Sequence, residues 1–428
     1  MILRARIILP VARPPVQDGA VRISGTRIAA VGRRRDLASR SPTETLDLGD
    51  VVLMPGLVNA HCHLDYTNMA GQFSPPKVFT DWIKLITSAK AEWGYSDFAE
   101  SWLSGAGMLV RTGTTTVADI ETLPLLLPEV WEATPLRVFS FLELTGVKSR
   151  HQPELILQEA ADRIETLPAS RCRAGLSPHS PYSTLPELLR LSGEMARRRG
   201  WRLCTHIAES ALEFEMFARG RGEMFEWLRR SERDMSDCGL GSPVQHVQRH
   251  GMLGENLLAV HVNYLAGKDA GLLAKYKTSV VHCPRSHAYF GHRSFPLRAL
   301  TEAGVNLCLG TDSLASVYKT RKQTVELDMF EEMRAFAAAH PSLAPKSILR
   351  MATVNGALAL GMRHRIGELS QGAFADLVAL PFTGKIKDIY DALMQHTGDV
   401  AASMIDGCWA IPPKSGVSDL AGSGLGRE

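Results

Sequence analysis

Two histidines stand one residue apart in the segment MPGLVNAHCHLDYTNM, residues 54–69. In a β-strand the side chains of residues i and i+2 point to the same face, so His61 and His63 would present their imidazole rings together. Paired imidazole nitrogens are typical ligands of zinc and other borderline divalent metals. The pair alone is weak evidence, because fourteen histidines among 428 residues give this spacing by chance roughly half the time. The metal hypothesis therefore depends on the residues that the rest of the chain places nearby.

A histidine or an aspartate also ends most of the other short apolar segments that are typical of buried strands. These residues are His179, His206, His261, His282 and Asp312. In a parallel barrel the carboxyl ends of all strands meet at one rim, where the catalytic groups of such barrels lie. Three imidazoles and one carboxylate suit a zinc-like metal that keeps one position for water. The predicted ligand set is His61, His63, His206 and Asp312.

A metal held at that rim would favour hydrolysis. A bound divalent metal lowers the pKa of water to about 7, so a hydroxide nucleophile is present at neutral pH. Asp312 could contact the metal and also accept the proton of the water. Glu209 follows His206 by three residues in the segment THIAES, where it could transfer a proton to the substrate. His261 could hydrogen-bond the water or the group under attack, so Glu209, His261 and Asp312 are the predicted catalytic residues.

After residue 57 the chain alternates short apolar segments with longer helical patterns. The apolar segments span residues 56–63, 114–120, 136–144, 172–180, 201–207, 256–265, 278–286 and 305–313. Two clear helical patterns lie between them, at 153–167 and 185–200. The second has Pro186 near its start and Gly200 at its end, as helices often do. Eight strand–helix repeats predict a (β/α)8 barrel, or TIM barrel, over residues 57–364.

The two ends of the chain have a different texture, in which short β-rich pieces alternate with Gly and Pro. Residues 1–56 and residues 365–428 are each too short to bury a comfortable core alone. We therefore expect the two segments to pack together as one small β-sandwich domain beside the barrel.

Composition and charge argue against several classes of protein. The net charge is +3 and no strongly basic run interleaves with aromatic residues, which argues against a nucleic-acid partner. No run approaches 18 apolar residues and the N-terminus lacks the pattern of a signal peptide, so we predict no membrane span. Seven cysteines with scattered spacing and no C-x-x-C fit reduced thiols better than a disulfide framework. The sequence thus predicts a cytoplasmic protein and leaves a homo-oligomeric state open.

The motifs that carry these residues resemble those of a known family. They are PGLVNAHCHLD, SPHSPYS, HIAES, VHVNYL, HCPRSH, LGTDSLAS, ATVNGALALGM and IGELSQGAFADLVAL. Together, and in this order over nearly the whole chain, they are similar to the metal-dependent amidohydrolase superfamily. They look most like its deaminases and chlorohydrolases that act on nitrogen heterocycles. The resemblance implies a barrel with a split β-sandwich domain, one catalytic metal, commonly zinc or iron, and hydrolytic deamination at a ring carbon.

The resemblance also assigns roles to individual residues. It implies metal ligation by the set that the strand ends offer, namely His61, His63, His206 and Asp312. It implies proton transfer by Glu209, contact with the water or the intermediate by His261, and substrate binding by His179. A binuclear site would need a bridging carbamylated lysine at a mid-barrel strand end, and the nearest lysine, Lys148, follows the wrong strand. We therefore expect one divalent metal per chain, zinc before iron or manganese.

Further predictions concern contacts with the substrate. Relatives carry an asparagine after HCP-x-S, whereas this chain has His287, and Arg285 lies two residues earlier. We expect this loop to face the distal half of a substrate, where Arg285 could meet a carboxylate or hydroxyls, or could be an ordinary salt-bridged residue. The helical pattern over residues 79–93 should wall the pocket and offers Trp82 as a ring or ribose contact. Glu143, at the end of the third strand, points at the same rim.

The leading hypothesis is an aminohydrolase that replaces a ring amino group by oxygen on an adenine-type nucleoside. Candidate substrates are compounds like adenosylhomocysteine, methylthioadenosine or aminodeoxyfutalosine. A rival hydrolyses a cyclic amide or removes chloride from a triazine with the same chemistry, so that only the pocket differs. A third hypothesis is a catalytically dead barrel used as a scaffold, which predicts missing ligands. Release of ammonia separates the first hypothesis from the other two.

Overall fold

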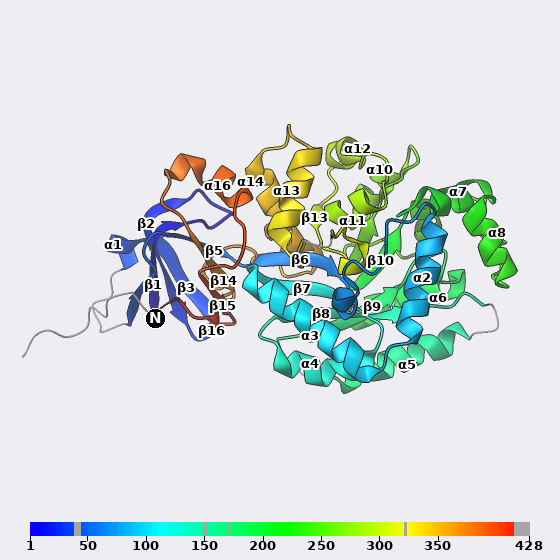
Figure 1. Ribbon diagram of the computed structural model, residues 1–428, viewed down its shortest axis with the longest axis horizontal. Helices are drawn as coiled ribbons and strands as arrows, with labels where there is room; N and C mark the ends of the chain where they lie inside the picture. The colour runs from blue at the N-terminus through cyan, green and yellow to red at the C-terminus, as the bar shows by residue number, and fades with distance from the viewer. Residues whose placement is uncertain (38–43, 149–151, 169–170, 321–322, 415–428) are drawn as a thin grey trace, which may run out of the picture.

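Eight parallel strands form the centre of the molecule and close into a nearly complete barrel (Figure 1). The computed structural model describes residues 1–37, 44–148, 152–168, 171–320 and 323–414. The barrel strands are β6 (Leu57–Cys62), β7 (Thr114–Glu121), β8 (Arg137–Leu144), β9 (Arg173–Pro178), β10 (Leu203–Ile207), β11 (Leu257–His261), β12 (Ser279–His282) and β13 (Leu307–Leu309). They follow one another around the barrel in the order of the sequence, and each overlaps one predicted segment. The predicted (β/α)8 barrel is therefore confirmed.

The barrel closes where the segment after β13 meets β6. The backbone amides of Thr311 and Asp312 donate to the carbonyl of His61, over 3.0 and 3.1 Å. Gly310 permits this approach, because a Cβ at that position would lie 2.7 Å from the same carbonyl oxygen. Closure of the barrel therefore places Asp312 directly beside the histidines of the first strand.

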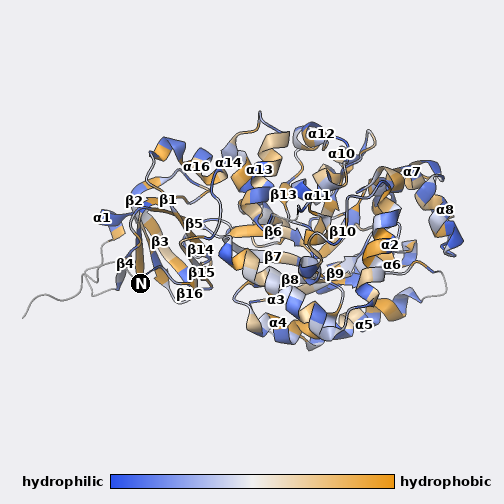
Figure 2. Cartoon of the chain, in the orientation of Figure 1, coloured by the Kyte–Doolittle hydropathy of each residue, from blue (hydrophilic) through white to orange (hydrophobic). Residues whose placement is uncertain are grey.

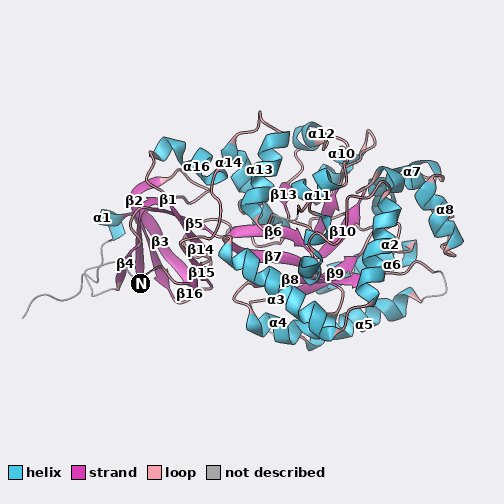
Figure 3. Cartoon of the chain, in the orientation of Figure 1, coloured by secondary structure: helices cyan, strands magenta, loops and turns pink. Residues whose placement is uncertain are grey.

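Most of the helices surround the barrel on the outside, as Figure 3 shows. The helices before the sixth barrel strand are α1 (Arg34–Leu37), α2 (Phe79–Ala91), α3 (Tyr95–Arg111), α4 (Leu127–Ala133), α5 (Pro153–Thr166), α6 (Pro186–Arg199), α7 (Ala211–Arg219), α8 (Glu223–Arg230) and α9 (Pro243–Arg249). Those after it are α10 (Asp269–Lys275), α11 (Pro284–Tyr289), α12 (Leu297–Glu302), α13 (Met329–Ala339), α14 (Pro345–Met351), α15 (Val354–Ala359) and α16 (Ile389–Met394). Short 3-10 helices are η1 (Leu64–Met69), η2 (Pro124–Leu126), η3 (Leu314–Ser316) and η4 (Ile386–Asp388). The predicted helices at 153–167 and 185–200 are α5 and α6, and Gly200 ends α6 with a φ of 68°, a conformation that glycine adopts without strain.

Strands from both ends of the chain share a second, mostly antiparallel sheet, on the left of Figure 1. Its strands are β1 (Ile2–Ile8), β2 (Val16–Ser24), β3 (Arg27–Arg33), β4 (Thr45–Asp47), β5 (Val51–Pro55), β14 (Leu377–Pro381), β15 (Ala402–Ile405) and β16 (Cys408–Ile411). β14 runs antiparallel to β5, with Leu377 opposite Pro55, so the C-terminal segment lies against the N-terminal one. The expected joint packing of the two ends is confirmed, whereas the domain boundaries at residues 56 and 365 stay predictions.

Hydrophobic side chains fill the space between the barrel strands and the helices, and a separate cluster lies within the terminal sheet. Figure 2 shows hydrophobic residues along the strands of both sheets. All seven cysteines lie in the described part of the chain, where no disulfide joins them. None of the helices in the described ranges combines the length and the apolar character that crossing a membrane requires.

Candidate metal centre and active site

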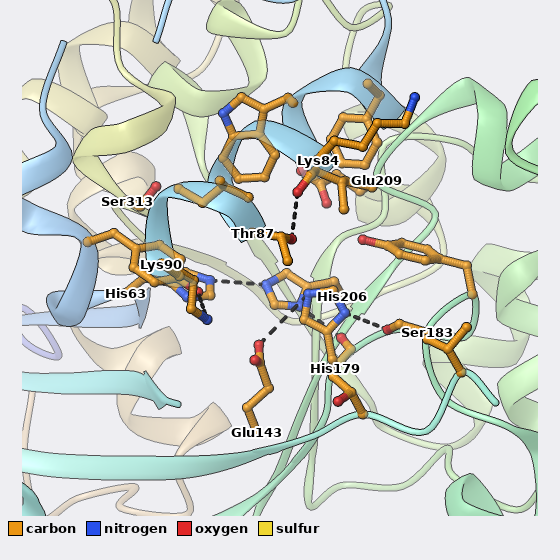
Figure 4. Close-up of a pocket in the computed structure, with 18 of the residues that line it drawn as sticks. His63, Lys84, Thr87, Lys90, Glu143, His179, Ser183, His206, Glu209 and Ser313 are labelled. Carbon is orange, nitrogen blue, oxygen red and sulfur yellow. Dashed lines mark hydrogen bonds and ion pairs between the residues drawn. The ribbon is translucent and has the colours of Figure 1, made fainter. Parts of the chain in front are cut away.

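Four side chains converge at the carboxyl end of the barrel strands. His61 and His63 come from the end of β6 and His206 from β10, while Asp312 follows β13. The Nε2 atoms of His63 and His206 are 3.3 Å apart (Figure 4). Asp312 Oδ1 lies 3.6 Å from His61 Nε2 and 3.7 Å from His63 Nε2, and all four side chains are buried. The structure thus brings the four predicted metal ligands together.

The ring atoms at this point have the hydrogen-bond pattern of metal ligands. His206 Nδ1 donates to the carbonyl of His179 over 2.8 Å, which leaves the Nε2 lone pair for the centre of the cluster. His61 Nε2 is buried without a hydrogen-bond partner among the described residues, although buried polar atoms nearly always have one. A cation at the centre would supply that partner. The donor set of three imidazoles and one carboxylate therefore fits a divalent metal of the zinc type.

Burial sets the protonation states that metal binding requires. It lowers the pKa of His206 to about 3, with a further contribution from His179. Burial, and then the neighbouring His61, also hold the pKa of His63 well below its ordinary value. Burial alone would raise the pKa of Asp312, but the adjacent His61, followed by His261 and His63, holds that pKa well below its ordinary value. Neutral imidazoles and an ionised carboxylate are the forms that bind metals.

A second group of titratable side chains lies beside the ligands and consists of Glu209, His261 and Asp312. Glu209 Oε1 lies 3.6 Å from His261 Nε2. Burial, then the charges of Asp312 and Glu213, raise the pKa of Glu209 well above its ordinary value. His261 and Asp312 hold left-handed backbone conformations, with φ of 70° and 55°, and such strain clusters at active sites. The arrangement places a buried carboxyl group and an imidazole next to the predicted metal ligands.

The backbone that carries Glu209 is fixed by a buried carboxyl group. Glu213 accepts hydrogen bonds from the amides of Ala208 and Glu209, over 3.0 and 2.9 Å. Asn263 donates to the carbonyl of Glu209 over 3.0 Å. Neither Glu213 nor Asn263 was predicted from the sequence. The pattern Ser210-x-x-Glu213 is a readable capping signal for the start of α7, but it does not reveal that the Glu213 carboxyl turns back to hold the loop before the helix.

The site opens into a cavity of about 750 Å³. The predicted residues that line it are His63, Trp82, Glu143, His179, His206, Glu209, His261 and Asp312. The helix predicted at residues 79–93 is α2, and it forms one wall of the cavity. His179 Nε2 lies 3.9 Å from Glu143 Oε1, and His179 Nδ1 lies 2.6 Å from Ser183 Oγ (Figure 4). These contacts fix the His179 ring at the cavity wall.

The outer part of the lining could not be read from the sequence. Trp227 and Leu228 of α8 and Lys90 of α2 also line the cavity. Met224, Trp227 and Leu228 form an i, i+3, i+4 stripe, which identifies the inward face of a helix. The stripe does not indicate which part of the protein this face packs against. The contribution of α8 to the cavity was therefore not predicted from the sequence.

Arg285 was predicted to contact the substrate, or else to be an ordinary salt-bridged residue, and its side chain lies among acidic partners in the structure. Arg285 does not line the cavity. Its guanidinium donates to Glu332 Oε1 over 2.5 Å, to the Glu326 carbonyl over 2.8 Å and to the carboxylate of Glu331. A buried guanidinium needs such partners, and α13 supplies two of them. Arg285 is therefore the salt-bridged residue that was the alternative reading of this loop.

His287 and His282 also lie away from the cavity lining. His287 Nδ1 is 3.0 Å from Asn263 Oδ1, and Asn263 in turn holds the carbonyl of Glu209. The ring of His282 stacks on Phe295 with a centroid distance of 3.9 Å. The predicted substrate contact by His287 is thus replaced by an indirect link to Glu209.

Comparisons with known proteins agree with this geometry. Residues 52–409 match the model of a protein family described as "Amidohydrolase family". The chain is 33% identical over 383 residues to the 5-methylthioadenosine/S-adenosylhomocysteine deaminase of Syntrophobacter fumaroxidans. This match covers 85% of this chain and 80% of the relative. It is 28% identical over 429 residues to the protein of the same name from Moorella thermoacetica, covering 95% of this chain and 89% of the relative.

Solved structures show the same fold. The aminofutalosine deaminase of Helicobacter pylori superimposes with a TM-score of 0.84 at 21% identity. The match covers 96% of this chain and 100% of the other. The zinc complex of an atrazine chlorohydrolase from Arthrobacter aurescens gives a TM-score of 0.82 at 20% identity, over 96% of this chain and 95% of the other. Because the family match spans residues 52–409, which is most of the chain, this protein belongs to the amidohydrolase family.

Proposed function

We propose that this protein is a metal-dependent aminohydrolase that converts the ring amino group of an adenine-type nucleoside into a carbonyl group and releases ammonia. The observation that carries the proposal is the buried Glu209 carboxyl group, which lies 3.6 Å from His261 Nε2 and beside the converging metal-type ligands. The relatives named 5-methylthioadenosine/S-adenosylhomocysteine deaminase support the substrate class. All predicted ligands are present and converge, which argues against a catalytically dead scaffold.

We further propose one divalent metal per chain, with zinc as the first candidate and iron or manganese as alternatives. The residues that would hold it are His61, His63, His206 and Asp312. A bound metal of this kind supplies a water molecule whose pKa is lowered to about 7. Lys148 Nζ lies 3.7 Å from Glu232 Oε2 at the surface, so this lysine does not bridge two metals.

The protein's own side chains would move the protons. Glu209 would donate a proton to the ring nitrogen next to the amine-bearing carbon, as a buried carboxyl group that faces the cavity beside His261. His261 Nε2 would donate a hydrogen bond to the oxygen that adds to the same carbon. The ionised Asp312 would accept the first proton of the incoming water and pass it to the amino group, which leaves as ammonia. The second proton of the same oxygen would return to Glu209 as the carbonyl forms, so that both carboxyl groups regain their starting states.

Ammonia release tests the proposal, assayed over a panel of adenine-type nucleosides, pterins, guanine, cytosine and chlorotriazines. We expect release from at least one adenine-type nucleoside, and elemental analysis is expected to find about one divalent metal per chain. His206→Ala is expected to lose the metal and to slow the reaction about 10³-fold or more, because the metal-activated water is lost. His250→Ala, at the end of α9 and away from the cavity lining, is the control and should change neither quantity.

The other outcomes separate the rivals. Bound metal without ammonia from any substrate would favour hydrolysis of a cyclic amide, and chloride release from a triazine would favour the chlorohydrolase. The absence of both bound metal and ammonia release would overturn the proposal.

A substitution of His287 tests the proposed role of Glu209 as the proton donor. We expect His287→Ala to lower kcat about tenfold and to change KM less than about twofold, because the hydrogen bond that orients Asn263 under Glu209 is lost. Steady-state kinetics on the best nucleoside measure both constants. His292→Ala, in the same loop and also away from the cavity lining, is the matched control. A raised KM with an unchanged kcat would instead return His287 to the role of a substrate contact.

The partner of the site in this proposal is a small heterocyclic substrate. The cytoplasmic location, the lack of a nucleic-acid partner and a homo-oligomeric state stay predictions from the sequence. Size-exclusion chromatography with light scattering measures the last of these directly.

A further inference from the structure

The outer part of the cavity carries one continuous apolar surface, which we call the apolar wall. It consists of residues that line the cavity and belong to a single hydrophobic cluster, namely Phe79, Ile83, Val147, Tyr182, Trp227 and Leu228. They come from α2, from the segments after β8 and β9, and from α8. In Figure 1, α8 lies at the end of the molecule opposite the terminal sheet. The wall is therefore built largely by elements outside the barrel strands.

The proposed chemistry leaves the apolar wall unused. Glu209, His261 and Asp312 act from the ends of the barrel strands, and His179 would hold the heterocycle beside them. None of these residues belongs to the wall. The wall can therefore contact only a part of the substrate that extends beyond the reacting ring.

The charges on the cavity lining restrict what that part can be. The cationic residues among the described lining are Lys84 and Lys90. Lys84 Nζ already pairs with Asp81 Oδ1 over 2.9 Å, and Lys90 Nζ donates to the hydroxyl of Tyr66 over 2.5 Å. No arginine lies on the described part of the lining. A carboxylate placed against the wall would lose its hydration and would have to compete with Asp81 for Lys84, whose Nζ lies 5.9 Å from the Trp227 ring, which is unfavourable.

We propose that the apolar wall binds an uncharged, apolar substituent carried by the nucleoside, of the kind found in the methylthio group of 5′-methylthioadenosine. The site then discriminates against a zwitterionic amino-acid tail such as that of S-adenosylhomocysteine. This inference rests on the proposed deamination of an adenine-type nucleoside, and it selects one substrate class from those that the relatives' names leave open. Trp227 is the residue we expect to contribute most, because its large, partly buried aromatic side chain offers the largest apolar contact area of the wall.

Three substrates and two variants test the inference. The kcat/KM for deamination is measured with adenosine, 5′-methylthioadenosine and S-adenosylhomocysteine. In the wild type we expect 5′-methylthioadenosine to exceed both others by about tenfold or more, the usual discrimination of a hydrophobic pocket for one small apolar group. In Trp227→Ala we expect the ratio of 5′-methylthioadenosine to adenosine to fall at least about fivefold.

Phe225→Ala supplies the matched control. Phe225 lies on the same helix and in the same hydrophobic cluster as Trp227, but it does not line the cavity. Its removal should leave the substrate ratio within about twofold of the wild type, even where both variants lose some thermal stability. A fall in the ratio that is specific to Trp227→Ala therefore reports contact with the substrate rather than general loosening of α8.

Two results would overturn the inference while leaving the proposed function standing. One is a kcat/KM for S-adenosylhomocysteine equal to or above that for 5′-methylthioadenosine. The other is an equal loss for adenosine and 5′-methylthioadenosine in Trp227→Ala. If no adenine-type nucleoside of the wider panel releases ammonia, the proposed function itself is wrong, and the inference fails with it. If ammonia comes only from a nucleoside other than these three, the inference alone is overturned.

Discussion

Glu209→Gln is expected to lower kcat about 10³-fold and to leave the bound metal at the wild-type amount. The amide has nearly the shape of the carboxyl group and keeps its hydrogen-bonding capacity, but it cannot donate and recover a proton at the ring nitrogen. General acid catalysis by a placed side chain contributes roughly 10²–10⁴-fold in rate, so the loss should fall in this range. Steady-state ammonia release and elemental analysis on the same preparation measure the two effects.

The expected separation of rate from metal content depends on the position of Glu209. The three converging imidazoles come from His61, His63 and His206, and Glu209 lies beside this group with His261 as its near neighbour. Glu226→Gln is the control, because Glu226 is a more exposed acid of α8 that pairs with Arg229 over 2.6 Å. Loss of metal in Glu209→Gln would mean that Glu209 is itself a ligand, and an unchanged kcat would remove it from the mechanism.

The histidines of the site were predictable because their positions follow from local rules. Alternation along a strand places His61 and His63 on one face, and the repeat of strands and helices brings His206 to the same rim. Asp312 needed one further step, the closure of the barrel, which eight repeats imply. These contacts join residues that are far apart in the chain, yet the regular geometry of the fold makes them readable.

The parts that could not be predicted depend on irregular long-range contacts. The residues next to Arg285 in the sequence offer it no obvious acidic partner. Its partners Glu331 and Glu332 come 46 and 47 residues later. Trp227 reads as the inward face of a short helix, and only the path of the chain between β10 and β11 places it over the cavity. Neither contact follows from a repeat or from strand alternation, so sequence patterns carry little information about them.

Arg137→Met is expected to lower the free energy of unfolding by about 3–5 kcal/mol, the usual cost of removing one partner of a buried ion pair. Arg137 begins β8 at the amino end of the barrel, and its side chain is 3% exposed. It donates from Nε to Asp376 Oδ2 over 3.0 Å and from Nη2 to Asp406 Oδ1 over 3.1 Å. Both aspartates belong to the terminal segment that carries β14 to β16, and the guanidinium also lies 3.9 Å above the ring of Phe374. Methionine keeps the apolar packing but leaves Asp376 buried without its cation.

Denaturant unfolding, followed by tryptophan fluorescence and circular dichroism, measures the loss. Arg298→Met is the control, because Arg298 forms an exposed pair with Glu302 over 2.7 Å and such pairs contribute little. Asp376→Asn in the Arg137→Met background should recover part of the stability, because it removes the buried charge that the first substitution leaves unpaired. Equal and small losses in the two arginine variants would show that this contact does not couple the barrel to the terminal sheet. The hydrogen bonds between β14 and β5 would then have to hold the C-terminal strands in place by themselves.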